Sequence, residues 1–312
     1  MQTFIDQAGH LIRTPATFQA LQIVVQRELE PFIDGLACED EGWRASGGVS
    51  LTGVWRATAE PVLLKLGLDA NQHYWTEQLA TTTAALIPRL YASGAMLGDW
   101  PLNWVVLERV PFGSLGPDWQ GAEFTMVLDA AVRFQQAAQR IEPRHVRQMD
   151  VAWWRRELTA GVAAEPPGPV ATVLDRLEAD WAWLTTVCPP QICHGDAHMT
   201  NVVSRTPPPQ PSQALLIDCQ PISQPWPCEA AYLQVLNSID RARVGYRGLV
   251  AQMAQLRLKY GLPVGQDRDL AKAAQLTLAW YAIRFWGMIP QRHTIADYRA
   301  ETERYIRAGA GA

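Results

Sequence analysis

The pattern of the sequence changes near residue 112, and this change limits the possible folds more than any other feature. Before it, short β-prone runs separated by glycine or proline follow one amphipathic helix. Beyond it, nearly every segment has apolar residues three and four positions apart. At 312 residues the chain also exceeds the size at which one hydrophobic core usually stops growing. We therefore predict an α+β fold with a β-rich lobe over residues 1–112 and a helical lobe over residues 113–312.

Local signals place the individual elements. Thr14 and Pro15 form a helix start, and apolar residues recur at helical spacing to about Leu29. A three-stranded antiparallel meander is expected next, with a glycine turn at residues 46–48. The predicted strands are 42–45, 54–58, 62–66, 89–93, 104–108 and 214–217, and the later helices are 72–86, 123–141, 151–159, 170–187, 229–260, 267–289 and 295–307.

The stretch HGDAHMTN, residues 194–201, carries the clearest chemical signal. His194 lies two residues before Asp196, and Asn201 lies five residues after it. An aspartate that takes the proton of an attacking hydroxyl and an asparagine that binds Mg²⁺ are found at this spacing in phosphoryl transfer. Three fixed letters also occur by chance, so the prediction depends on further parts elsewhere in the chain.

Four such parts occur in the chain order that phosphoryl transfer by this type of loop requires. A glycine turn lies between the first two strands of the predicted meander, where backbone N–H groups can approach phosphates. A lysine lies within an apolar strand, a glutamate lies on the next helix, and an aspartate follows the apolar run after the loop. These parts are residues 46–50, Lys65, Glu77 and Asp218.

The HGDxxxxN loop, the following Ile217-Asp218 pair, the GGxS turn and the VLLK strand together resemble the aminoglycoside phosphotransferase and choline kinase group. The resemblance covers about residues 40–235. It implies a bilobal, protein-kinase-like fold with the nucleotide between the lobes. It also implies Mg²⁺-dependent transfer of the γ-phosphate of ATP or GTP to a hydroxyl of a small molecule such as an antibiotic, an amino alcohol or a sugar.

The resemblance also implies a role for each matching residue. Asp196 would be the catalytic base, Asn201 and Asp218 would bind Mg²⁺, and His194 and His198 would hold the loop. Lys65 would contact the α- and β-phosphates with Glu77 as its ion-pair partner. The full set of nucleotide-binding residues would be Ser46, Gly47, Gly48, Ser50, Lys65, Glu77, Glu108 and Val110, the last two through their backbone, and the acceptor pocket would include Trp226, Glu229, Trp280, Tyr281 and Arg284.

One departure from the group's pattern leaves a rival function open. Many members carry a second carboxylate two residues after the metal-binding Asp, whereas this chain has Gln220. An uncharged amide binds Mg²⁺ poorly, so a second ion would depend on Asn201, Asp218, phosphate oxygens and a compensating Glu229. The rival is a nucleotide-binding pseudokinase with weak or no catalysis.

Ordinary structural roles also remain open for these residues. A lone strand lysine such as Lys65 usually extends its charge into solvent, and residues 46–48 also suit a plain hairpin turn. Cys193, His194, Asp196 and His198 are conceivable zinc ligands, although the glycine between them argues against a helix. Most of the 13 tryptophans fall on predicted helices, where core packing is the default. The acids of the last predicted helix suit a solvated face, or in similar kinases an amine-binding one.

Composition excludes several other classes. The net charge is −4 and no basic block occurs, so nucleic acid is not an expected partner. Residues 1–13 lack the apolar core of a signal peptide, and the longest apolar stretch, 276–289, is interrupted by Arg284, so no membrane partner is expected. Five cysteines without a CxxC pair suggest buried free thiols. We expect a cytoplasmic protein, and nothing in the sequence indicates its oligomeric state.

Overall fold

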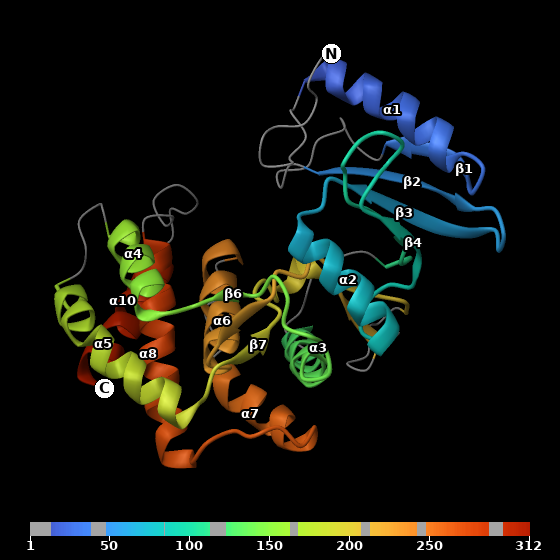
Figure 1. Ribbon diagram of the computed structural model, residues 1–312. Coiled ribbons are helices and arrows are strands. Elements are labelled where there is room, and N and C mark those ends of the chain that lie inside the picture. The colour runs from blue at the N-terminus through green and yellow to red at the C-terminus, as the bar shows by residue number, and fades with distance from the viewer. Residues whose placement is uncertain are drawn as a thin grey trace.

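The computed structural model describes residues 14–38, 48–83, 85–112, 123–162, 168–206, 213–241, 248–286 and 296–312. An antiparallel sheet with one helix along it forms the N-terminal part, and helices form most of the rest (Figure 1). The predicted α+β class is therefore confirmed. All five cysteine side chains are free thiols, and all but Cys38 are buried.

The N-terminal sheet has five strands in the order β1-β2-β3-β5-β4, and each neighbouring pair is antiparallel. Val62, Leu64 and Leu66 alternate along the central strand β3 (Glu60–Leu66) and share one buried cluster with helix α1 (Pro15–Leu29). Lys65 alternates with these residues and therefore projects from the opposite face of the sheet. The other strands are β1 (Ile33–Cys38), β2 (Val49–Trp55), β4 (Leu90–Gly94) and β5 (Trp104–Glu108).

Helix α2 (Ala70–Thr82) links the sheet to the helical part. It begins at Asp69, whose carboxylate accepts a hydrogen bond from the Gln72 N–H at 2.7 Å. Its buried residues Trp75 and Leu79 belong to the larger hydrophobic cluster. Apart from these two, Leu86 and Ile87, the residues of that cluster lie between Phe124 and Ile306. This helix therefore fixes the face of the sheet that carries Lys65 against the rest of the molecule.

The helical part is built around α8 (Asp267–Phe285), which packs against five other helices. Two small sheets, β6-β10-β7 and β8-β9, carry the loops considered below. None of the helices in the described ranges is long and apolar enough to span a membrane. The elements are α3 (Glu123–Ala138), β6 (Arg147–Gln148), α4 (Val151–Gly161), α5 (Val170–Val187), β7 (Gln191–Cys193), the 3₁₀ helix η1 (Met199–Asn201), β8 (Val202–Ser204), β9 (Ala214–Leu216), β10 (Ile222–Gln224), α6 (Pro227–Arg241), α7 (Leu249–Lys259), α8 and α10 (Ala296–Gly311).

The structure differs from the prediction at the first strands. Residues 42–45 and the turn at 46–47 lie outside the described residues, so the strand and turn predicted there stay predictions, whereas β1 at Ile33–Cys38 and the start of β2 at Val49 were not predicted. Asp34 and Gly35 suggest a turn by sequence, but Gly35 has a φ of 62° at a shift in the β1–β2 register, which is a β-bulge. Strand β2 ends at Trp55, because residues 56–59 form the turn into β3.

Most of the helices lie close to their predicted positions. The structure has α5 at the predicted residues and α1 capped by Thr14, which accepts a hydrogen bond from the Thr17 N–H at 3.1 Å. The predicted helix 229–260 is two helices, α6 and α7, and α7 begins after Gly248, whose φ of 79° is not helical. The lobe boundary at residue 112 stays a prediction.

Candidate active site

The loop that contains Asp196 is held rigidly between β7 and β8. The His194 carbonyl accepts a hydrogen bond from the Gln220 N–H at 3.0 Å, and the Asn201 carbonyl accepts one from the Ile217 N–H at 3.0 Å. Gly195 has a φ of 82°, and a Cβ at this position would lie 2.0 Å from the Gln220 carbonyl oxygen. Only glycine permits this approach, so the two chain segments are locked together at this point.

The carboxylate of Asp196 is surrounded by hydrogen-bond donors. Its Oδ2 accepts a hydrogen bond from Asn201 Nδ2 at 2.9 Å, and its Oδ1 accepts one from the Tyr232 hydroxyl at 2.6 Å. His198 Nε2 lies 3.4 Å from Oδ1. Burial acts to raise the pKa of the Asp196 carboxyl, but the hydrogen bonds from His198 and Tyr232 outweigh it, so the pKa lies below its ordinary value. Asp196 is therefore ionised at neutral pH and fixed in orientation.

His194 supports the loop from within the core. Its ring is fully buried against Phe134, and its Nδ1 accepts a hydrogen bond from the Asp196 N–H at 3.3 Å. Burial lowers the pKa of His194 to about 4, so the ring is neutral at physiological pH. A neutral ring in this position suits the loop-holding role that the resemblance implies.

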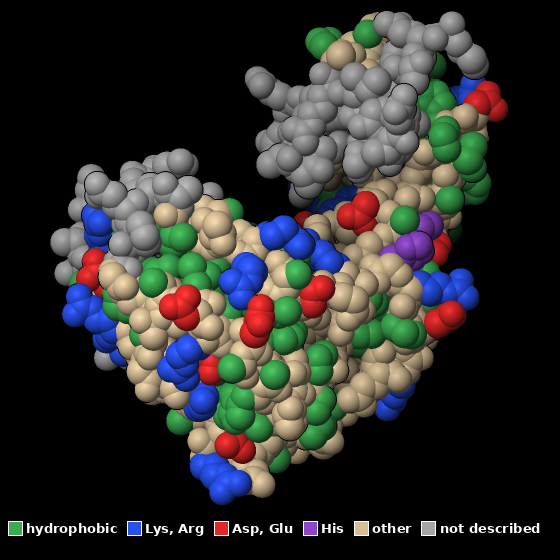
Figure 2. Space-filling model, turned by 60° about the vertical axis from the view of Figure 1, so that its left-hand side comes forward, with side chains coloured by type: hydrophobic (Ala, Val, Ile, Leu, Met, Phe, Trp, Pro, Cys, Tyr) green, Lys and Arg blue, Asp and Glu red, His purple; other side chains and the backbone are tan. Residues whose placement is uncertain are grey.

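Asn201, Asp218 and Lys65 lie in one cleft of about 200 Å³, together with Asp196 and residues of β2, β3 and the start of α2. Figure 2 shows the molecule hollowed between its two parts, with Lys and Arg side chains at the edge of the hollow. Lys65 forms an ion pair with Asp218 and is largely buried. Asp218 has a φ of 57°, an uncommon conformation for a residue other than glycine.

The donor set of this cleft fits Mg²⁺. Asn201 uses its amide N–H groups on Asp196, which leaves its carbonyl oxygen unused by any described residue. Asp218 Oδ1 accepts a hydrogen bond from the Lys65 ammonium, and Oδ2 has no partner among the described residues. Amide and carboxylate oxygens are the hard ligands that Mg²⁺ prefers, and Mg²⁺ in proteins usually completes its shell with water and phosphate oxygens. Within the described ranges, no group of three or more His, Cys, Asp or Glu side chains is arranged to hold a metal ion, which does not favour the zinc alternative.

The structure does not pair Lys65 with Glu77. The Glu77 carboxylate instead accepts a hydrogen bond from Ser93 on β4 at 2.6 Å and lies 3.7 Å from His73. The positions of α2 that face Lys65 are Gln72 and Thr76. Because consecutive helix residues are about 100° apart, Glu77 points away from the side that carries Thr76.

Only part of the predicted phosphate loop can be placed. Gly48 and Ser50 line the cleft, whereas Ser46 and Gly47 lie outside the described residues. A Cβ at Gly48 would lie 2.9 Å from the Leu66 carbonyl oxygen, so this position requires glycine for close packing of β2 on β3. Ser50 pairs directly with Lys65 across the two strands.

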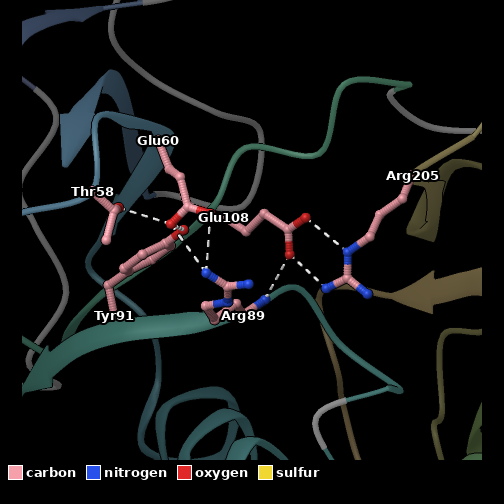
Figure 3. Close-up of polar contacts among 6 residues, drawn as sticks. All are labelled: Thr58, Glu60, Arg89, Tyr91, Glu108 and Arg205. Atoms are coloured by element: carbon pink, nitrogen blue, oxygen red, sulfur yellow. Dashed lines mark hydrogen bonds and ion pairs between the residues drawn. The ribbon is translucent and has the colours of Figure 1, made fainter.

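An ion pair joins the end of β5 to Arg205, the residue that follows β8. Glu108, the last residue of β5, accepts hydrogen bonds from the exposed Arg205 guanidinium at 2.8 and 2.5 Å (Figure 3). The bonds from Arg205 lower the pKa of Glu108. The backbone of Phe112 also pairs with that of Ser204 at the end of β8. The predicted adenine-binding connector, Glu108 to Val110, is thus held against the strand that follows Asn201.

Four residues predicted for the acceptor pocket, Trp226, Glu229, Trp280 and Tyr281, are buried in the core instead. Trp280 is fully buried among aromatic residues, Trp226 lies beneath the Arg257 guanidinium at 5.0 Å, and Glu229 is buried in a polar network. Large apolar rings on helix faces pack inward unless the fold leaves a gap. The fifth predicted residue, Arg284, is half-buried.

The polar network around Glu229 reaches the Asp196 loop. Glu229 accepts a hydrogen bond from the Gly195 N–H at 3.2 Å and another from Gln135 Nε2 at 2.7 Å. Gln135 in turn accepts a hydrogen bond from the buried Arg257. Glu229 therefore supports the loop from below and does not face the cleft, so it does not replace the carboxylate that Gln220 lacks.

Sequence reasoning missed four side chains that contact the site or its connector. Tyr232 bonds to Asp196, Arg205 bonds to Glu108, and Gln135 and Arg257 support the loop through Glu229. Only Tyr232 has a sequence signal, because it lies one helical turn after Glu229 on α6.

Comparison with known proteins agrees with this geometry. Residues 44–224, more than half of the chain, match the phosphotransferase enzyme family. No curated protein matches the sequence.

Several solved structures share the fold. A putative aminoglycoside phosphotransferase from Ralstonia eutropha JMP134 has a TM-score of 0.54 at 16% identity, over 94% of this chain and 96% of that one. A choline kinase from Cryptosporidium parvum Iowa II has a TM-score of 0.57 at 10% identity, over 93% and 94%. A thermostable mutant of aminoglycoside phosphotransferase APH(4)-Ia, solved with ADP and hygromycin B, has a TM-score of 0.52 at 15% identity, over 93% and 99%. The predicted bilobal, protein-kinase-like fold and the predicted resemblance are confirmed.

Proposed function

Because this chain belongs to the phosphotransferase enzyme family, we propose that it transfers the γ-phosphate of ATP or GTP to a hydroxyl group of a small molecule. The observation that carries this proposal is the arrangement of the cleft. An ionised, oriented carboxylate, an asparagine and a lysine–aspartate pair face one space between the two parts of the molecule. The solved relative with ADP and hygromycin B supports a nucleotide donor and a small-molecule acceptor.

In the proposed reaction Asp196 orients the acceptor. The acceptor hydroxyl donates its hydrogen bond to the carboxylate, its oxygen attacks the γ-phosphorus, and the proton passes to Asp196 as the bond to the leaving diphosphate breaks. The Asn201 amide holds Oδ2, so the carboxylate does not rotate during this step.

Lys65 and Asp218 act on the nucleotide. When the nucleotide binds, its phosphate oxygens would form ion pairs with the Lys65 ammonium in place of Asp218. Asp218 would then be released from its present ion pair. Asn201 and Asp218 would then hold Mg²⁺, which supplies charge neutralisation for the phosphates when bound. The adenine or guanine base would contact the connector around Glu108 to Val110, whose position the Arg205 ion pair fixes.

Arg284, the predicted acceptor residue that is not fully buried, is already engaged by other side chains of the protein. The Arg284 guanidinium lies over the rings of Trp153, Tyr281 and Phe285 at 5.0 to 5.9 Å and donates a hydrogen bond to Glu157 at 2.8 Å. These rings already stack on a cation of the protein itself, which disfavours an acceptor held by cation–π contact.

The acids of the last helix give no clear support for amine recognition either. Glu301 pairs with Arg304, and Glu303 pairs with Arg299 and Arg307. Asp297 lies outside the residues whose side chains are described. We therefore give neutral hydroxy compounds the same weight as aminoglycosides and amino alcohols in the test.

The test is release of nucleoside diphosphate from Mg-ATP and Mg-GTP across a panel of aminoglycosides, macrolides, choline, amino alcohols and neutral sugars. We expect at least one acceptor to stimulate release, and Asp196→Asn to abolish that stimulation because the base is lost. The rival pseudokinase function predicts Mg-nucleotide binding without stimulated release by any acceptor. Absence of nucleotide binding would contradict both.

A further inference from the structure

A tyrosine without an assigned role bonds directly to the proposed catalytic base. The Tyr232 hydroxyl on α6 lies 2.6 Å from Asp196 Oδ1, a short distance typical of a hydroxyl that donates to a carboxylate. This is the same hydrogen bond that an acceptor hydroxyl must make with the base. The phenol therefore occupies the place at Oδ1 where the acceptor hydroxyl is expected.

The other positions on the carboxylate are also covered. His198 Nδ1 accepts a hydrogen bond from the Thr200 N–H at 3.3 Å, so Nε2 carries a proton, and it lies 3.4 Å from Oδ1. Asn201 donates to Oδ2 at 2.9 Å. Donors of the protein thus lie against both oxygens of Asp196.

The tyrosine ring is held in place by its neighbours. Its ring centroid lies 5.5 Å from that of Tyr281, 6.0 Å from Phe285 and 6.4 Å from His198. Burial, together with the charge of Asp196, raises the pKa of Tyr232 well above its ordinary value, so the phenol keeps its proton. Tyr232 is therefore a hydrogen-bond donor to Asp196 at physiological pH.

We propose that Tyr232 makes the enzyme select an acceptor over water, because its hydroxyl blocks the base until an acceptor displaces it. This inference rests on the proposed function. In the competing reaction a water oxygen attacks the γ-phosphorus, the bond from that phosphorus to the bridging oxygen breaks, and the water proton passes to Asp196. Nucleoside diphosphate and inorganic phosphate are released. Water lacks the binding energy to displace the phenol, whereas an acceptor that fills its site has it.

The test measures nucleoside diphosphate release from Mg-ATP by the full-length protein without any acceptor. Tyr232→Phe keeps the ring and removes only the hydroxyl, so we expect acceptor-free release to rise at least about tenfold, the effect of one charge-assisted hydrogen bond. The double variant Asp196→Asn with Tyr232→Phe should lose that rise. Tyr232→Leu, which also removes the ring, should raise release at least as much.

Tyr260→Phe is the matched control, because its hydroxyl bonds to the Asp129 carboxylate at 2.7 Å and it does not line the cleft. It should leave acceptor-free release unchanged. Unchanged or lower release by Tyr232→Phe, with Mg-ATP affinity equal to that of the wild type, would overturn the role of Tyr232 and leave the proposed function intact. If the wild type does not bind Mg-ATP, both the proposed function and this inference are contradicted.

Discussion

Glu229 makes the stability of this protein depend on pH near neutrality. Its side chain is fully buried, and burial raises the pKa of the carboxyl from 4.5 to about 7, against the opposing effect of the hydrogen bond from Gln135. The folded state therefore favours the protonated form more than the unfolded state does. Ionisation of Glu229 opposes folding.

The sign and size of the effect follow from linkage. Well below pH 4.5 the carboxyl is protonated in both the folded and the unfolded state, so it does not lower the stability of the fold. Well above pH 7 it is ionised in both states, and the loss of stability is complete. The difference between 4.5 and about 7, at about 1.4 kcal/mol for each pH unit, corresponds to about 3 kcal/mol in total. Most of this loss of stability should occur as the pH rises from 5 to 8.

Chemical denaturation at pH 5 and pH 8 measures the effect. The free energy of unfolding of Glu229→Gln minus that of the wild type should be about 2 to 3 kcal/mol larger at pH 8 than at pH 5, which means that the variant becomes relatively more stable as the pH rises. The control is Glu178→Gln, whose side chain is 74% exposed and pairs with Arg155 on the surface. A wild type and a Glu229→Gln variant with parallel pH dependence would refute the reasoning.

Two further predictions concern the elements that hold the site. Gly195→Ala should destabilise the fold by about 3 kcal/mol or more, because a Cβ there strains the backbone and meets a carbonyl oxygen at 2.0 Å. Gly168→Ala, with no atom within 4 Å of the added Cβ, should leave the melting temperature nearly unchanged, and equal shifts in the two variants would contradict the account. A double-mutant cycle of Glu108→Gln and Arg205→Gln should give a coupling of about 1 kcal/mol that falls at high salt, since the pair is partly exposed. A coupling of zero at low salt would show that the ion pair does not brace the connector.

Short-range patterns indicate from the sequence which residues lie together in the cleft. Asp196 and Asn201 share one loop, and Asp218 follows the adjacent strand, so their joint position follows from the chain itself. Lys65 could be predicted because an apolar strand with one lysine places that lysine on the face opposite its buried neighbours.

Contacts between segments that lie far apart in the chain could not be predicted from the sequence. Arg257 is linked to the Asp196 loop through Gln135 and Glu229, and these three residues come from three different helices. The partner of Glu77 was predicted wrongly because a shift of one position along a helix turns a side chain by about 100°. Burial of Trp226 and Trp280 likewise depends on how helices pack, which periodicity alone does not specify.

The affinity for Mg-ATP, measured by calorimetry on the wild type and two variants, tests the assignment of the cleft most directly because it needs no acceptor. Asp196→Asn should bind Mg-ATP as the wild type does, since the proposed base acts on the acceptor. Asp218→Asn should bind it at least about tenfold more weakly, because a charged ligand of the Mg-nucleotide is lost. Equal affinity of Asp218→Asn and the wild type would contradict the central claim that this cleft holds the nucleotide.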